Sequence, residues 1–365
     1  MSGGVDSSVA ALLLKEQGYD VTGVYMKNWS KDLPGMKCPW AEDLADAKRV
    51  AVKLGIDFEV WDFEKEYHEK VVEYMLDEFK KGNTPNPDVM CNQEIKFKLF
   101  FEKAMERGAD FIATGHYART SKLSSELHLG HAQGRSAKPM VQDRASAESI
   151  KLLRAIDENK DQTYFLYRIS EDAIKHTLFP VGGMKKPEVK KLAEEHGLHN
   201  AYKKESMGVC FVGEVGMKDF LKEYIKIEPG EIREVETEKV LGVHEGAVFY
   251  TIGQRHGLYL SGVAGEVNDG MPYYVVAKDL KKNIVYVSKN LNDSHIWTKE
   301  LKLKDVIMRS EAKNVLVRLR HRAPLISATF DGKTIHFENE IKRPAAGQSA
   351  VIYDGEVCLG GGIIE

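Results

Sequence analysis

The sequence predicts an α/β fold, a doubly wound parallel sheet, followed by a small central β-rich domain and a C-terminal β-barrel. Three observations predict it. A Ser-Gly-Gly-x-Asp-Ser loop opens an apolar helix at the start of the chain, and strands then alternate with helices. After about residue 217 the chain changes to short apolar runs separated by Gly, Asn and Asp. We therefore expect domains over residues 1–217, 218–271 and 272–365.

The first element is the loop of residues 2–8, called the phosphate loop below. Gly3 and Gly4 lack a Cβ, so their backbone can approach an anion closely. Ser7 and Ser8 stand where the helix begins, where its N–H groups and the positive end of its dipole face the same anion. The loop is similar to the PP-loop of the ATP pyrophosphatases, which release pyrophosphate and leave AMP on the substrate. The alternative is a Ser/Gly surface turn before an ordinary helix.

The strand that should precede and support this loop is missing from the predicted elements. A phosphate loop of this kind normally follows a parallel strand, yet no apolar run precedes Ser2. We therefore expect the sheet to lack its first strand, which would remove several kcal/mol of apolar burial, at about 25 cal/mol per Å². Weak ATP binding is the expected consequence.

Hydrophobic periodicity predicts the remaining elements of the first half. Val9, Leu12 and Leu13 share one face of the loop helix, which ends at Gly18. Buried strands are expected at residues 21–26, 58–61 and 111–114, and helices at 44–54, 67–80, 95–107, 162–169 and 187–196. Residues 120–149 are polar and rich in Ser, Gln, His and Gly, which favours a mobile hairpin or insertion. Two prolines within residues 83–92 favour an extended loop that presents Asp88 and Cys91 just before a helix.

The strands of the second half are short. We expect them at residues 247–252, 273–277, 283–287, 315–319, 326–330, 334–337 and 350–353. The arginines at 318, 320 and 322 alternate, so on one strand they would share a face that suits backbone phosphates. A solvated strand face is the alternative.

Composition narrows the class of protein. The formal charge of −3 does not indicate a nucleic-acid binder, but residues 301–343 hold ten Lys and Arg against five Asp and Glu. Neither a signal peptide nor a membrane-spanning apolar run is found, so we expect a cytoplasmic protein without a membrane partner. The four cysteines, Cys38, Cys91, Cys210 and Cys358, have neither zinc spacing nor Cys-x-x-Cys pairing, so no bound metal is expected. Cys38 and Cys358 fit small buried hydrophobes.

Seven motifs occur in order and resemble one family over nearly the whole chain. They are the phosphate loop and residues 86–97, 113–118, 160–166, 205–211, 250–255 and 347–351. The chain resembles the tRNA-specific 2-thiouridylases, the MnmA/TrmU family of PP-loop enzymes with an adenine nucleotide alpha hydrolase-like fold. Glu205 and Met207 depart from the Asp and Thr that many members carry.

The resemblance implies a two-thiol reaction. ATP, with Mg²⁺, would adenylate O2 of the wobble uridine of a tRNA, and Asp6 is a candidate to help bind the cation. A persulfide on Cys210, loaded by a cysteine desulfurase or sulfur-relay protein, would then deliver sulfur to C2. Cys91 would act as nucleophile and form a transient disulfide with Cys210, with Asp88 assisting proton transfer. The enzyme is expected to be a monomer.

The resemblance also implies binding residues. ATP would contact Ser2, Gly3, Gly4, Val5, Asp6, Ser7, Ser8, Met26 and Gly115. The target base would meet Asn86, Pro87 and Asp88. The tRNA would contact His116, Lys160, Asp161, Gln162, Arg320, His321 and Gln348. Two alternatives stay open: a catalytically impaired tRNA-binding relic, and another AMP-forming PP-loop ligase.

Overall fold

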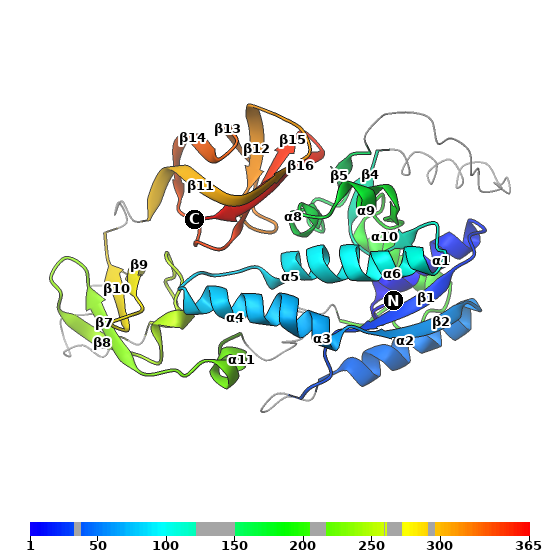
Figure 1. The fold of residues 1–365 in the computed structure, drawn as a ribbon, viewed down its shortest axis with the longest axis horizontal. Coiled ribbons are helices and arrows are strands. Elements are labelled where there is room, and N and C mark those ends of the chain that lie inside the picture. Colours follow the sequence, from blue (N-terminus) through cyan, green and yellow to red (C-terminus); the bar gives the residue numbers. More distant parts are fainter. Residues whose placement is uncertain (33–37, 122–149, 205–216, 259, 261–271, 291–295) are drawn as a thin grey trace.

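The structure, a computed structural model, describes residues 1–32, 38–121, 150–204, 217–258, 260, 272–290 and 296–365. Figure 1 shows an α/β part that holds the first residue and two β parts beyond it. Among the described residues, no helix combines the length and the apolarity needed to cross a membrane. The expected insertion at 120–149 lies almost entirely outside the described residues.

The first domain has the predicted parallel pairing. Strand β1 (Thr22–Lys27) pairs in parallel with β2 (Asp57–Asp62), and β3 (Ile112–Ala113) pairs in parallel with β6 (Thr177–Leu178). Within the described residues these two pairs are separate two-stranded sheets. The start of the chain lies between them, because the Met1 amine donates to the Val24 carbonyl and Gly115 packs on the phosphate loop.

Helices cover these strands. The helix α1 (Val5–Glu16) begins within the phosphate loop, with Gly4 as its N-cap, and buries Val9, Leu12 and Leu13 as predicted. The helix α2 (Trp40–Leu54) ends at Gly55, whose φ of 60° permits the left-handed C-cap. Further along the chain lie the helices α8 (Thr163–Leu166), α9 (Glu171–Lys175), α10 (Lys186–Glu195) and α11 (Met217–Tyr224). The helix expected at 162–169 is therefore a single turn.

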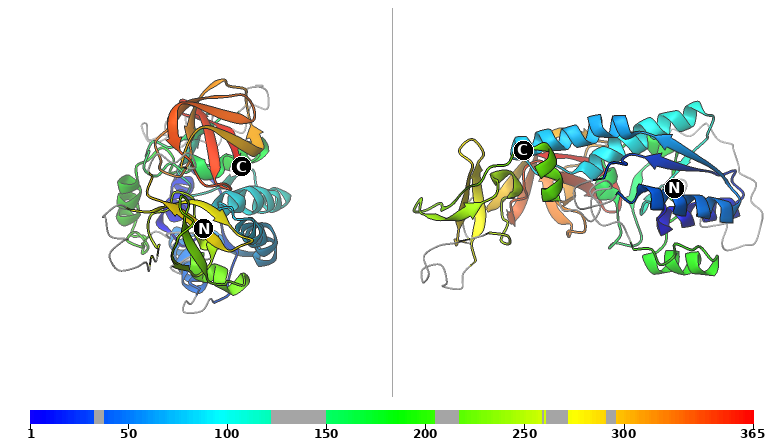
Figure 2. Two further views of the ribbon diagram at one scale, coloured as in Figure 1. Left: turned by 90° about the vertical axis from the view of Figure 1, so that its left-hand side faces the viewer. Right: turned by 90° about the horizontal axis from the view of Figure 1, so that it is seen from below.

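Two long helical segments lie side by side and reach toward the β domains (Figures 1 and 2). One consists of α3 (Glu64–Tyr67), the π-helical stretch η1 (His68–Val72) and α4 (Glu73–Lys80). The other consists of α5 (Pro87–Met90), η2 (Cys91–Leu99) and α6 (Phe100–Glu106). The prediction of an extended loop over residues 83–92 was wrong from residue 87 onward, because Pro87 occupies the first helical position, where a missing N–H costs nothing.

The middle domain is a four-stranded sheet of order β8-β7-β10-β9. Its strands are β7 (Gly230–Glu234), β8 (Val240–His244), β9 (Tyr274–Asp279) and β10 (Ile284–Ser288). The expected boundary after residue 271 would separate β10 from β7, with which it pairs in parallel. We therefore propose that this domain extends to Ser288 and that the next begins near Trp297. The strand expected at 247–252 is instead a 3₁₀ turn, η3 (Ala247–Phe249).

The last domain is the predicted barrel. Its strands are β11 (Trp297–Met308), β12 (Asn314–Arg318), β13 (Ile326–Phe330), β14 (Thr334–Lys342), β15 (Ser349–Asp354) and β16 (Val357–Ile364). They follow the order β11-β14-β13-β12-β15-β16, and β11 also pairs with β16, which closes the barrel. The sheet then continues from β16 into β5 (Leu152–Arg154) and β4 (Ala118–Thr120) of the first domain.

Candidate active site

Two glycines fix the shape of the phosphate loop. Gly3 has a φ of +75°, and a Cβ on it would lie 2.4 Å from the carbonyl oxygen of Asp43 in α2. A Cβ on Gly115 would lie 2.5 Å from the backbone nitrogen of Ser7. Any side chain at either position would collide with backbone, so both must be glycine. The structure thus brings Gly115, distant in sequence, against the loop as predicted, and places Met26 near the end of β1.

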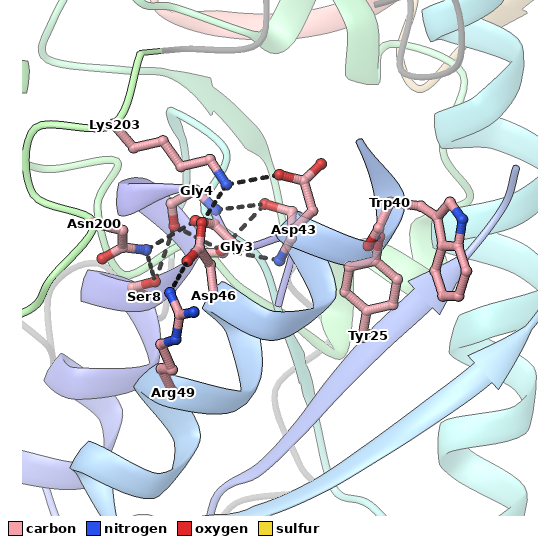
Figure 3. Close-up of polar contacts among 12 residues, drawn as sticks. Gly3, Gly4, Ser8, Tyr25, Trp40, Asp43, Asp46, Arg49, Asn200 and Lys203 are labelled. Atoms are coloured by element: carbon pink, nitrogen blue, oxygen red, sulfur yellow. Dashed lines mark hydrogen bonds and ion pairs between the residues drawn. The ribbon is translucent and has the colours of Figure 1, made fainter. Parts of the chain in front are cut away.

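Side chains of the phosphate loop itself and of a segment distant in sequence form hydrogen bonds that stabilise the loop. The Ser7 and Ser8 hydroxyls donate to the Gly4 carbonyl over 3.1 and 2.9 Å. The Asn200 amide lies 2.9 Å from both the Gly3 carbonyl oxygen and the Ser8 Oγ (Figure 3). Lys203 binds Asp43 of α2 at 2.7 Å. Sequence reasoning missed Asn200 and Lys203, since no local pattern links residue 200 to residue 3.

Asp6 is paired within the protein. Its carboxylate accepts from Lys186 Nζ at 2.7 Å and from the Tyr117 hydroxyl at 2.8 Å. Lys186 is buried at the first position of α10. Lys186 and Tyr117 were also missed. Among the described residues, no three His, Cys, Asp or Glu side chains gather as metal ligands would.

The segment of residues 86–91 begins a helix. Asn86 is the N-cap and accepts from the Val89 N–H at 3.4 Å, Pro87 is the first helical residue, and half-buried Asp88 lies in the first turn. Cys91 follows in the next turn and is 1% exposed. The N-cap side is packed against the barrel, where Gln348 Nε2 donates to the Thr84 carbonyl at 2.6 Å. The predicted target-base residues and Gln348 are thus brought together.

His116 follows β3, and Gln162, the N-cap of α8, contacts the next residue, Tyr117. His116 is half-buried, and its Nδ1 lies 2.9 Å from the Thr114 hydroxyl. Burial, with a contribution from nearby Lys96, lowers the pKa of His116 well below its usual value, so the ring is neutral at pH 7. Gln162 accepts from the Tyr117 N–H at 2.8 Å. Half-buried Lys160 lies two residues before it.

The arginine stripe on one strand face was a wrong prediction. Strand β12 ends at Arg318, which is 4% exposed and donates to Asp161 at 2.6 Å. Asp161 is itself 1% exposed, so this carboxylate binds protein groups. Arg320 is exposed beyond the strand, and Arg322 adopts a left-handed φ of 64° in the turn. A change from strand to turn ends the alternation on which the stripe depended.

His321 lies between these two arginines. Its ring centroid is 4.6 Å from that of Phe165. Burial, reinforced by Arg322, lowers the pKa of His321 to about 4. His321 is therefore neutral at pH 7 and suited to stacking rather than to charge pairing.

All three described cysteines are buried, as expected for Cys38 and Cys358 but also for Cys91. Cys38 and Cys358 are buried, and burial raises the pKa of Cys358 to about 11, which fits an inert thiol. Cys210, with the rest of residues 205–216, lies outside the described residues. The geometry between Cys91 and Cys210 therefore stays a prediction.

The fold and the phosphate loop define a class: a nucleotide-binding α/β domain that carries two β domains. Three family models match the chain, one after another. They are the tRNA methyl transferase HUP domain at residues 1–214, the tRNA methyl transferase PRC-barrel domain at 218–289 and the aminomethyltransferase beta-barrel domain at 293–364. Relatives named tRNA-specific 2-thiouridylase MnmA come from Listeria monocytogenes serotype 4b, strain CLIP80459 (44% identity), and Bacillus subtilis, strain 168 (42% identity). Each match covers 100% of this chain and 93% of the relative. The chain belongs to the tRNA-specific 2-thiouridylase family.

Proposed function

We propose that this protein catalyses the ATP-dependent conversion of uridine to 2-thiouridine in tRNA. Family membership over the whole chain supports the reaction. The observation that carries it is the packing of Gly115 onto the phosphate loop, since two segments assigned to ATP meet with no space for a Cβ.

The proposed ATP site consists of residues Ser2, Gly3, Gly4, Val5, Asp6, Ser7 and Ser8 with Met26 and Gly115. The glycine backbone and the start of α1 fit an anionic polyphosphate. Mg²⁺ would enter with ATP and screen the phosphate charge. Asp6 is the carboxylate within the loop, and its pairing with Lys186 keeps a cation beside the proposed phosphate position.

The proposed chemistry uses ATP and two thiols. O2 of uridine attacks the α-phosphorus, and pyrophosphate leaves. The terminal sulfur of a Cys210 persulfide attacks C2, and AMP leaves with the former O2. The Cys91 thiolate then attacks the Cys210 sulfur, which gives a Cys91–Cys210 disulfide and releases the 2-thiouridine sulfur. An external thiol reductant resets the pair, and a persulfide-bearing donor protein reloads Cys210.

The tRNA would lie across the first and last domains. We propose contacts through His116, Lys160, Gln162, Arg320, His321 and Gln348, with Asn86, Pro87 and Asp88 at the base. Asp161 is reassigned as a positioning residue, because it binds the buried Arg318. We further propose that one copy of the chain suffices.

A thiolation assay tests this function. The protein is incubated with ATP, Mg²⁺, a persulfide source and unmodified tRNA, and nucleosides are analysed by mass spectrometry. Cys91→Ser is expected to abolish 2-thiouridine but to leave ATP-dependent adenylation of tRNA, since activation uses no thiol. The control Cys358→Ser, at an inert buried thiol, should still thiolate. Normal thiolation by Cys91→Ser would disprove the two-thiol mechanism, and a wild type that binds tRNA without adenylating it would favour the relic.

A further inference from the structure

The segment after α10 holds the phosphate loop through one amide side chain (Figure 3). Asn200 is 2% exposed, and its Nδ2 lies 2.9 Å from both the Gly3 carbonyl oxygen and the Ser8 Oγ. We infer that Asn200 is a positioning residue of the ATP-binding loop. This inference deepens the proposed function and rests on it.

The hydrogen-bond network fixes the orientation of the Asn200 amide. The Gly3 carbonyl can only accept, so the atom that faces it must be the NH₂ group. The Ser8 hydroxyl donates its hydrogen to the Gly4 carbonyl at 2.9 Å, so its lone pairs are free to accept from Asn200. Hydrogen bonds therefore run in one direction, from the Asn200 amide to the Ser8 hydroxyl and from that hydroxyl to the Gly4 carbonyl.

This chain keeps both glycine carbonyls away from a bound anion. Asn200 binds the Gly3 oxygen, while Ser7 and Ser8 bind the Gly4 oxygen. A carbonyl oxygen that faced a polyphosphate would repel it, whereas an anion site is built from N–H groups. By binding the Gly3 oxygen, Asn200 keeps the peptide plane in the orientation that an anion site requires.

Asn200 is in turn fixed by its neighbours. Lys203 binds Asp43 at 2.7 Å and Asp46 at 2.5 Å, both on α2, and His199 Nε2 lies 3.0 Å from Asp46. The backbone of Asp43 also lies against Gly3. These contacts link the loop, α2 and residues 199–203 to one another and restrain the position of the Asn200 amide.

The carbonyl oxygen of the Asn200 amide gives an independent indication that this residue serves the phosphate loop. Asn200 Oδ1 is buried without a hydrogen-bond partner among the described residues. A buried unsatisfied carbonyl costs free energy, so this side chain is not optimal for stability alone. Its donors toward the loop are what distinguish it from an apolar residue of similar size.

Calorimetric titration with a non-hydrolysable ATP analogue and Mg²⁺ tests the inference. Loss of two hydrogen bonds in Asn200→Ala should weaken binding about tenfold. Asn200→Asp keeps the size of the side chain but presents an acceptor and a negative charge, so binding should weaken further. The control Tyr202→Ala changes a side chain of the same segment that is 79% exposed and makes none of these contacts, so it should bind like wild type. In the thiolation assay Asn200→Ala should raise the KM for ATP, with little change in kcat and in the Kd for tRNA.

The outcomes distinguish a failure of the role of Asn200 from a failure of the proposed function. If wild type binds the analogue and both Asn200 variants bind it within twofold of wild type, Asn200 is not a positioning residue and the proposed function stands. If wild type itself does not bind the analogue, the proposed ATP-dependent function fails. Should Asn200→Ala not fold, the isosteric Asn200→Asp decides the question.

Discussion

At the scale of single residues, Arg318 and Arg320 have different surroundings although they are only two positions apart. Arg318 is buried and bonded to the Asp161 carboxylate, which also lies 3.7 Å from Arg154. Arg320 lies beyond the end of β12 and is exposed. The first side chain therefore stabilises the fold, and the second is available to a phosphate.

This contrast predicts opposite effects of two alanine substitutions. Arg318→Ala leaves a buried carboxylate with reduced compensation and should lower the free energy of unfolding by about 3–5 kcal/mol. Arg320→Ala should leave stability unchanged but weaken tRNA binding and reduce its salt dependence by about one phosphate contact. Chemical denaturation and tRNA titrations at several salt concentrations measure both. An unchanged salt slope for Arg320→Ala would remove Arg320 from the proposed tRNA surface.

Much of the candidate site could be predicted from the sequence because its glycines, prolines and cysteines stand in local motifs. Gly3 and Gly115 meet as the motifs imply. Asn200 and Lys186 could not be predicted, since their partners lie 197 and 180 residues away and an isolated Asn or Lys carries no signal of its contact. The arginine stripe failed because period-2 alternation cannot show where a strand ends.

At the scale of elements, amphipathic helices and short apolar strands were predictable, whereas proline-containing and aromatic segments were not. Proline was read as excluding helix over residues 83–92, but with Asn86 as N-cap it begins one. Residues 247–252 have the composition of a strand, yet Ala247–Phe249 form a 3₁₀ turn. At Pro87 a local preference, that of proline for the first helical position, selects the helix, whereas at residues 247–252 the tertiary context overrides strand preference.

The facing strand pairs β1–β2 and β3–β6 predict the effect of an added strand. An apolar segment of roughly 5–6 residues placed ahead of Met1 should pair between them. Each large side chain buried there contributes about 1.5–3 kcal/mol before entropy, so Tm should rise by several degrees. Affinity for ATP should rise too, because the phosphate loop would then follow a hydrogen-bonded strand.

A matched extension of the same length made of Gly and Ser is the control. It adds backbone but no apolar side chains, so it should raise neither Tm nor ATP affinity. If the two extensions give equal Tm values, the sheet needs no further strand. The same conclusion follows if the chain without an extension binds ATP tightly and unfolds cooperatively at high temperature.

At the scale of the whole molecule, the three domains meet at the loop that precedes α5. Lys278 of the middle domain donates to the Gly82 carbonyl at 2.9 Å. The Thr84 N–H donates to the Ala346 carbonyl of the barrel at 2.8 Å. Burial lowers the pKa of Lys278 to about 8. The helix α5, which we propose to meet the target base, therefore begins at a junction that each domain helps to hold.

Two glycines of the barrel allow the contribution of this junction to be measured. Gly347 and Gly355 both have positive φ, +88° and +53°, so alanine costs about 1–2 kcal/mol of backbone strain at either. Only at Gly347 would the new Cβ meet another domain, 2.9 Å from Asn83 Cβ. Gly347→Ala should therefore lower Tm more than Gly355→Ala and should also reduce thiolation. Equal Tm losses and equal activities would show that the junction contributes little.

The sheet that runs from the barrel into the first domain has a consequence for synthesis. Leu153 of β5 pairs with Val357 of β16, and the Arg154 N–H donates to the Glu356 carbonyl. During synthesis on the ribosome, β5 has no β16 to pair with until about 200 further residues have been added, which takes on the order of 10–40 s at typical elongation rates. During that time it is an unpaired strand edge of a nascent chain, the kind of surface that chaperones shield.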